Sequence, residues 1–168
     1  TVTGVQTCAL PILQPTNLKD EHFQEELASL EADIQVVVAF RMLPRAVWDM
    51  PPEGTINLHA SLLPAYRGAA PIHWAIINGE KETGVTTFRL KHEIDTGDIL
   101  FQEKTPIGEN ETTGELYERL KIMGADLVLK TVDAIEDGTA KPRPQPDRAL
   151  SKAPKLNREE CRIESDQP

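Results

Sequence analysis

The segment Thr55-Ile-Asn-Leu-His-Ala-Ser-Leu-Leu-Pro64-Ala-Tyr-Arg-Gly-Ala-Ala-Pro71 decides the fold of this 168-residue chain. Its first six residues predict a strand, and the prolines and the glycine that follow predict a bent loop. Pro71 suits the first turn of a helix, which we expect to end at Asn78-Gly79. A strand that leads through a loop into a helix is the building unit of α/β proteins.

The flanking segments extend the same alternation. Residues 34–40 are mostly β-branched, which predicts a strand buried on both faces of a parallel sheet. Asp20 is expected to cap a helix before that strand, and residues 44–48 predict a short helix after it. Two further strands are expected at 85–90 and 99–105. We therefore predict an α/β domain with a mostly parallel central sheet flanked by helices.

The longest predicted helix begins at Thr112-Thr-Gly-Glu115, which has the sequence of a capping box, and ends near Gly138. Its apolar residues recur at helical spacing and should pack on the sheet as one stripe. The stripe comprises Leu116, Leu120, Met123, Leu127, Thr131 and Ile135.

Composition narrows the classes of protein. The net charge of −9 argues against a nucleic-acid-binding surface spread over the whole domain, although residues 141–168 carry seven Lys/Arg against five Asp/Glu. The sequence contains no apolar stretch near the ~20 residues that a membrane span needs. The two cysteines, Cys8 and Cys161, lack metal-ligand spacing, so we expect a cytoplasmic protein without a metal site.

Three side chains could carry out acyl transfer. Asn57 and His59 are two residues apart on a strand and therefore project from the same face. Asn57 could donate a hydrogen bond to a developing oxyanion, and His59 could assist it or move a proton. A carboxylate in the turn Ile94-Asp-Thr-Gly-Asp98 would stabilise and orient a protonated imidazole, and spacing alone does not choose between Asp95 and Asp98. Taken singly, each motif more often serves structure than function.

Together and in this order, Asn57-x-His59, Ser61-Leu-Leu-Pro64 and Asp95-Thr-Gly97 resemble the folate-dependent formyltransferases. The resemblance implies a Rossmann-like catalytic domain, a catalytic trio of Asn57, His59 and Asp95, and the co-substrate 10-formyltetrahydrofolate with no metal. It selects Asp95 over Asp98. The residues that it implies for folate binding are Arg41, Met42, Leu43, Ser61, Leu62, Leu63, Pro64, Ile94, Thr96 and Gly97.

Within this family, residues 66–72, 83–86, 95–100 and 138–142 are most similar to the enzymes that formylate methionine on initiator tRNA. The resemblance thus implies initiator methionyl-tRNA as the acceptor and a role in translation initiation. Formyl transfer to an amino sugar nucleotide and hydrolysis of 10-formyltetrahydrofolate are alternative enzyme activities. A noncatalytic folate-binding fragment is an alternative of another class.

The resemblance also suggests how the chain is organised. Residues 1–12 look like the translation of a sequencing adapter and are interpreted as a non-native leader, with a genuine irregular terminus as the alternative. Residues 13–140 are expected to form a catalytic domain that lacks the family's N-terminal strands. Residues 141–168 are expected to form an extended proline-rich linker and the start of an absent C-terminal domain. We therefore expect a weak or inactive fragment of an enzyme that is monomeric at full length and contacts tRNA mainly through the missing parts.

Overall fold

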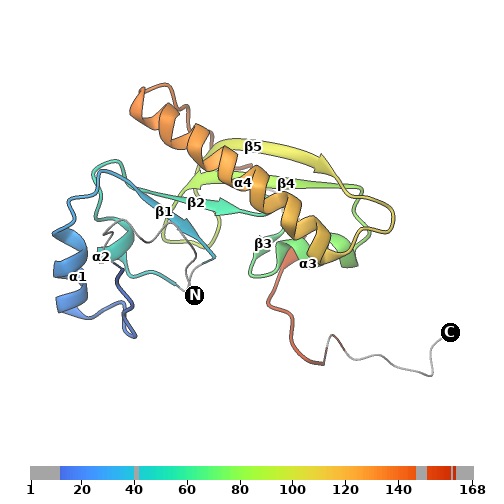
Figure 1. Cartoon of the computed structure of the whole chain (residues 1–168), viewed down its shortest axis with the longest axis horizontal. Helices are drawn as coiled ribbons and strands as arrows, with labels where there is room; N and C mark the ends of the chain where they lie inside the picture. The colour runs from blue at the N-terminus through green and yellow to red at the C-terminus, as the bar shows by residue number, and fades with distance from the viewer. Residues whose placement is uncertain (1–11, 40–41, 147–150, 160, 162–168) are drawn as a thin grey trace.

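The computed structural model describes residues 12–39, 42–146, 151–159 and 161, and these residues form an α/β unit around one four-stranded sheet (Figure 1). The strand order is β1-β2-β4-β5. The strands are β1 (Gln35–Val38), β2 (Thr55–His59), β4 (Glu82–Arg89) and β5 (Ile99–Pro106). Most of the predicted leader lies outside the described residues, so its origin stays a prediction.

The predicted α/β class is confirmed, but the sheet is mixed rather than mostly parallel. Strand β1 pairs with β2 in parallel, whereas β2 with β4 and β4 with β5 are antiparallel. The β4–β5 pair is antiparallel because residues 90–98 connect the two strands without the helical crossover that a parallel pair requires.

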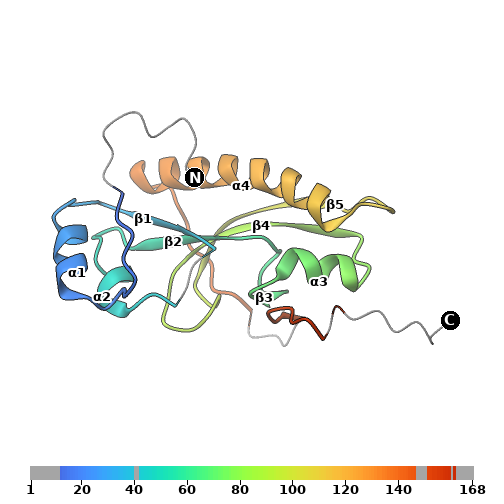
Figure 2. The ribbon, with the colours of Figure 1, turned by 60° about the horizontal axis from the view of Figure 1, so that its bottom comes forward.

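Four helices accompany the sheet in the described part of the chain. They are α1 (Glu21–Ala28), α2 (Arg45–Trp48), α3 (Pro71–Ile77) and α4 (Thr113–Glu136). Helix α4 runs along one face of the sheet, while α1 and α2 lie at the end of the molecule opposite α3 (Figure 2). No helix within these described ranges is long and apolar enough to cross a bilayer.

Helix α4 determines which face of β2 is left for chemistry. Its capping box is formed as predicted, and its buried leucines pack against Val85 and Leu58. Gly124 allows close approach, since a Cβ atom there would lie 2.7 Å from a methyl group of Leu58. Because Leu58 faces α4, the alternating residues Asn57 and His59 face the opposite side of the sheet.

Strand β1 departs from the prediction of burial on both faces. Val36 and Val38 are 43% and 57% exposed, and they alternate with half-buried Gln35 and Val37. Val38 pairs with Leu58 and so lies on the side covered by α4. Helix α4, however, packs mainly over β4 and β5.

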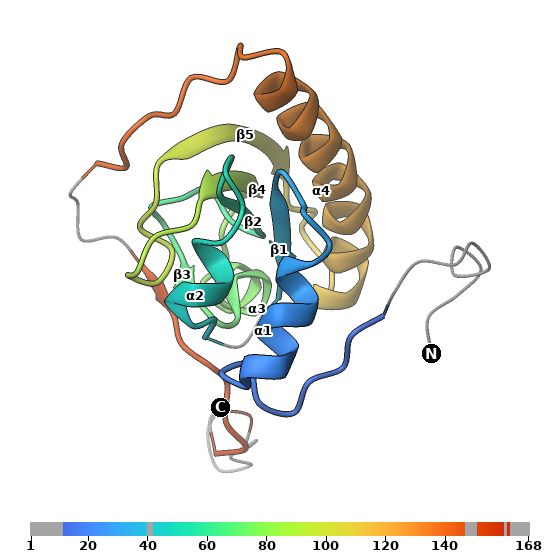
Figure 3. The ribbon, with the colours of Figure 1, turned by 90° about the vertical axis from the view of Figure 1, so that its left-hand side faces the viewer.

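The segment after α4 returns to the sheet. Residues 139–146 leave the helix and run past β5 (Figure 3), and Arg143 exchanges two backbone hydrogen bonds of 2.8 Å with Ile99. Farther along, β6 (Lys152–Ala153) pairs in parallel with β3 (Arg67–Gly68) in the loop after β2. The segment predicted as a linker therefore packs against the loops that surround Asn57 and His59.

Candidate active site

The carboxyl end of β2 carries two of the predicted catalytic side chains. Asn57 and His59 are 3% and 7% exposed, and the strand's alternation directs both to the face away from α4. On the neighbouring strand, Phe88 and Thr86 are their register partners. The predicted common orientation of Asn57 and His59 is thus confirmed.

The imidazole of His59 lies between two oxygen atoms. Its Nε2 is 2.8 Å from the carbonyl oxygen of Tyr66. Because a carbonyl oxygen only accepts hydrogen bonds, Nε2 must carry a proton. The other ring nitrogen, Nδ1, lies 3.8 Å from Oδ2 of Asp95. The ring therefore lies between a carbonyl oxygen that it can donate to and a carboxylate.

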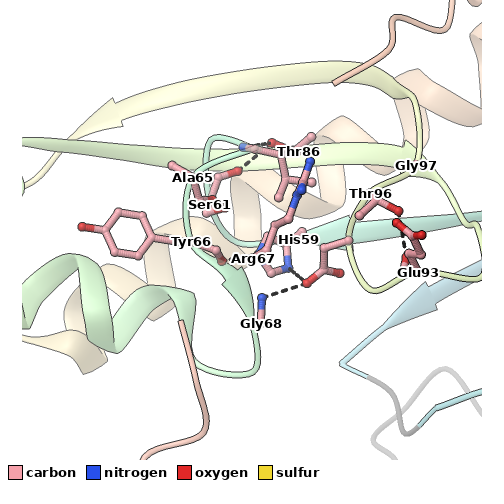
Figure 4. Close-up of polar contacts among 12 residues, drawn as sticks. His59, Ser61, Ala65, Tyr66, Arg67, Gly68, Thr86, Glu93, Thr96 and Gly97 are labelled. Carbon is pink, nitrogen blue, oxygen red and sulfur yellow. Dashed lines mark hydrogen bonds and ion pairs between the residues drawn. The ribbon is translucent and has the colours of Figure 1, made fainter. Parts of the chain in front are cut away.

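Asp95 comes from the connection between β4 and β5. It is 5% exposed, and its Oδ2 also accepts a hydrogen bond of 2.9 Å from the amide of Gly68 (Figure 4). Asp98, the other carboxylate in the turn, instead binds Lys91 at 2.9 Å. The structure thus brings Asp95 to His59 and directs Asp98 elsewhere, while the catalytic role of Asp95 remains a prediction.

Asn57 provides an unsatisfied polar atom at the site. Its Oδ1 is buried and has no hydrogen-bond partner among the described residues. A buried polar atom without a partner costs about 1–3 kcal/mol, so native proteins usually pair it with a protein group, a water or a ligand. Because Oδ1 is an acceptor, a ligand that donates a hydrogen bond could satisfy it.

The loop after β2 is held by hydrogen bonds from the neighbouring strands. Ser61 Oγ donates to the carbonyl of Ala65 at 2.7 Å. Thr86 Oγ1 donates to the carbonyl of Ser61 at 2.6 Å and accepts from the amide of Leu63 at 3.2 Å. Gln102 Nε2 donates to the carbonyl of Leu63 at 2.8 Å. Ser61 and Leu63 are both buried and shape the loop, whereas Leu62 and Pro64 are half-buried.

The other residues predicted to bind folate lie at two positions. Ile94, Thr96 and Gly97 belong to the Asp95 turn, where Ile94 is 60% exposed and Gly97 is buried. A Cβ atom at Gly97 would lie 1.6 Å from the carbonyl oxygen of Arg89, so no larger residue fits there. Met42 and Leu43 follow β1, which is parallel to β2, and so lie toward the same sheet edge as His59. Arg41 lies outside the described residues, and the folate contacts stay predictions.

Three contributors to the site were missed by sequence reasoning. They are the backbone carbonyl of Tyr66, the hydroxyl of Thr86 and the side chain of Gln145, which donates to two carbonyls of the Asp95 turn. Burial and the neighbouring Glu80 raise the pKa of the Tyr66 phenol, so that phenol stays neutral and serves structure. The sequence carried no signal for these three groups. Thr86 lies opposite His59 on the neighbouring strand, and the register of two strands cannot be read from the sequence.

Metal ligands do not gather in the described part of the chain. No group of three or more His, Cys, Asp or Glu side chains comes together there. His22, His73 and His92 are exposed. The chemistry that this arrangement supports is hydrogen bonding and proton transfer by one amide, one imidazole and one carboxylate.

Comparison with known proteins agrees with this geometry. The formyl transferase family matches residues 2–132, a range that includes most of the predicted leader. The methionyl-tRNA formyltransferase of Porphyromonas gingivalis is 56% identical over 167 residues, which represent 97% of this chain and 52% of that protein. The chain therefore spans about half the length of the curated relatives that it matches.

Two solved structures share the fold. HypX from Aquifex aeolicus, determined in complex with tetrahydrofolic acid, superposes with a TM-score of 0.74 and 27% identity, covering 86% of this chain and 25% of HypX. The formyltransferase PseJ from Anoxybacillus kamchatkensis, bound to a UDP-linked formamido sugar and tetrahydrofolate, gives a TM-score of 0.64 and 28% identity over 73% of this chain and 64% of PseJ. Together with the match to the family over most of its length, these similarities establish that the chain belongs to the formyl transferase family.

Proposed function

We propose that this chain supplies the catalytic residues for transfer of a formyl group from 10-formyltetrahydrofolate to the amino group of methionine on initiator tRNA. The observation that carries the proposal is the convergence of Asn57, His59 and Asp95 at the carboxyl end of β2. The acceptor is suggested by the relatives at 55–56% identity, which are named methionyl-tRNA formyltransferases.

The buried amide of Asn57 fits the formyl group of a folate co-substrate. The Nδ2 group of Asn57 would donate a hydrogen bond to the formyl oxygen as negative charge develops there during attack by the amine. Such donors act most strongly where water is excluded, and Asn57 is 3% exposed. The role that we assign to Asn57 is therefore oxyanion stabilisation.

His59 and Asp95 are assigned the movement of protons. Transfer joins the formyl carbon to the amine nitrogen, breaks the bond from that carbon to folate N10 and moves one proton from the amine to N10. The distance of 3.8 Å between His59 Nδ1 and Asp95 Oδ2 is too long for a direct hydrogen bond, so a bridging water fits the relay. Asp95 would also stabilise positive charge on the ring.

The remaining expectations follow from the same proposal. We infer that most of the tRNA contact is made by parts of the relatives' length that this chain does not span. The chain's net charge of −9 supports this inference, because RNA binding needs Lys and Arg opposite the phosphates. A cytoplasmic, monomeric enzyme acting in translation initiation completes the proposal.

The test uses a chimera in which this chain replaces the matching segment of the P. gingivalis relative. The chain alone and the chimera are each assayed for formyl transfer to methionyl initiator tRNA, for transfer to a UDP-linked amino sugar, and for formate release without an acceptor. The proposal expects the chimera to formylate only the tRNA, and the chain alone to be weak or inactive.

Other outcomes would replace the proposal with a specific rival. Transfer to the amino sugar, but not to tRNA, would make the chain part of a sugar formyltransferase. Formate release at an equal rate without any amine would indicate a hydrolase. Binding of tetrahydrofolate without turnover of any kind would indicate a noncatalytic folate-binding module.

A further inference from the structure

The segment after α4 reaches the turn that carries Asp95. The two backbone hydrogen bonds between Arg143 and Ile99 set the position of this segment along β5. Two residues farther on, the side chain of Gln145 is half-buried against the turn. A residue that is 50 positions away from Asp95 in the sequence is thereby in contact with its backbone.

All the polar atoms of the Gln145 side chain are engaged. Its Nε2 donates to the carbonyl oxygen of Asp95 and to that of Gly97, both at 2.8 Å. Its Oε1 accepts from Nε of Arg67 at 3.1 Å and from Nη2 of Arg67 at 2.5 Å. The amide nitrogen has two hydrogens, so each carbonyl receives its own hydrogen bond. The single side chain therefore links two carbonyl groups of the Asp95 turn to the loop after β2.

The turn needs such support because its backbone is strained. Asp95 has a φ of +53°, in the left-handed region that costs a residue with a side chain about 1–2 kcal/mol. The same conformation directs its carboxylate to His59 and to the Gly68 amide. Relaxation of this φ would rotate the carboxylate away from the imidazole.

The structure assigns Gln145 the role of a positioning residue that holds the Asp95 carboxylate in reach of His59, with Arg67 orienting the Gln145 amide. This assignment rests on the proposed function for its effect on catalysis. A glutamate at this position would still accept from Arg67, but it would lose both donors and place negative charge against two carbonyl oxygens. The two links can therefore be separated experimentally.

The first experiment compares Gln145→Glu and Gln145→Leu with the parent chimera by steady-state kinetics. Misplacement of a catalytic group by about 1 Å lowers turnover by up to about 100-fold, so we expect kcat to fall by roughly 10- to 100-fold in both variants. We expect the KM for the folate to rise as well, because Gln145 also holds the carbonyl of Gly97, a residue predicted to contact the folate. The matched control is Gln24→Leu on α1. It removes a comparable hydrogen bond, from Gln24 Nε2 to the carbonyl of Leu18 at 3.1 Å, far from the Asp95 turn in the sequence.

The second experiment does not depend on activity. Amide hydrogen exchange is measured by NMR on the full chain, with attention to the Gly68 amide that donates to Asp95 Oδ2. We expect Gln145→Glu to speed exchange at Gly68 at least tenfold and Gln24→Leu to leave it unchanged. This result would stand even if the chain proved to have no transferase activity.

Three results would overturn the assignment. One is an unchanged Gly68 exchange rate in Gln145→Glu. Another is a kcat that recovers fully at a lower temperature, which would show that the variant lost only stability. An effect in Gln145→Leu that is absent from Gln145→Glu would also overturn it, because the link to Arg67 alone would then account for the phenotype.

Discussion

The substitution Asp95→Asn removes one buried charge while keeping the shape of the side chain. The asparagine carbonyl can still accept the hydrogen bond from the Gly68 amide, which the Asp95 carboxylate accepts at 2.9 Å. The fold around the turn should therefore persist. What is lost is the charge that faces His59 Nδ1 at 3.8 Å.

The size of the loss follows from that distance. Two unit charges about 4 Å apart interact by about 4 kcal/mol at an effective dielectric constant of about 20. Each 1.4 kcal/mol is a factor of ten in rate, so complete loss of this term in the transition state would slow transfer by about 10³-fold. We expect a fall in kcat of about 10²- to 10³-fold, since water in the site would restore part of the stabilisation.

The assay is formyl transfer by the chimera under single-turnover conditions, with thermal unfolding measured in parallel. The matched control is Asp98→Asn in the same turn, where the carboxylate pairs with Lys91 near the surface. Exposed pairs contribute about 0–1 kcal/mol, so this control should lose less than about fivefold. Equal losses in the two variants, or an unchanged rate in Asp95→Asn, would refute the assignment of Asp95.

Three further predictions concern the framework of the site. Gly68→Ala should lower the free energy of unfolding by at least about 2 kcal/mol in urea titrations, because a residue with a side chain is strained at a φ of +126° and its Cβ would lie 2.4 Å from the carbonyl oxygen of Ala153. Thr131→Val should cost about 1–3 kcal/mol in the same titrations, because it leaves the buried Thr87 hydroxyl without its 2.8 Å partner. A hydrogen bond from Arg119 and a weaker effect of a backbone amide lower the pKa of Glu111 below its ordinary 4.5. The contribution of Glu111 to folding stability is therefore present above pH 4.5 and is lost as the pH falls toward the lowered value. Glu111→Gln should therefore flatten the loss of thermal stability between about pH 5 and 3.

Each framework prediction has a control of the same chemistry. Gly79→Ala also places a residue at positive φ, +65°, but meets no atom within 4 Å, so its cost should be smaller than that of Gly68→Ala. Thr139→Val removes an exposed hydroxyl and should change stability little. Glu109→Gln also removes one negative charge, two residues from Glu111. It should leave the loss of thermal stability at low pH as it is in the parent protein. Controls as damaging as the test variants would contradict the structural reasons given.

Local patterns in the sequence were sufficient to predict the parts of the fold that depend on neighbouring residues. The capping box at Thr112, the N-cap at Asp20 and the common face of Asn57 and His59 all follow from contacts within a few residues. These features depend on helix and strand periodicity, and each was found where expected.

The features that sequence reasoning missed depend on distant contacts. Strand-forming residues do not show in which direction the neighbouring strand runs. The antiparallel pairing of β4 and β5 was therefore not foreseen. The choice of Asp95 over Asp98 came from family resemblance, and the structure supplies its geometric basis in the distance to His59. Gln145 was invisible because an isolated glutamine in a proline-rich segment carries no pattern that points to a turn 50 residues away.

The amide, the imidazole and the carboxylate are proposed to act together on a folate-bound formyl group. The most direct test is His59→Ala in the chimera, with tetrahydrofolate binding measured by calorimetry beside single-turnover transfer to methionyl initiator tRNA. We predict that transfer falls at least about 10²-fold while the dissociation constant for tetrahydrofolate changes less than about threefold. Transfer within a few-fold of the parent, or a loss of folate binding as large as the loss of rate, would contradict it.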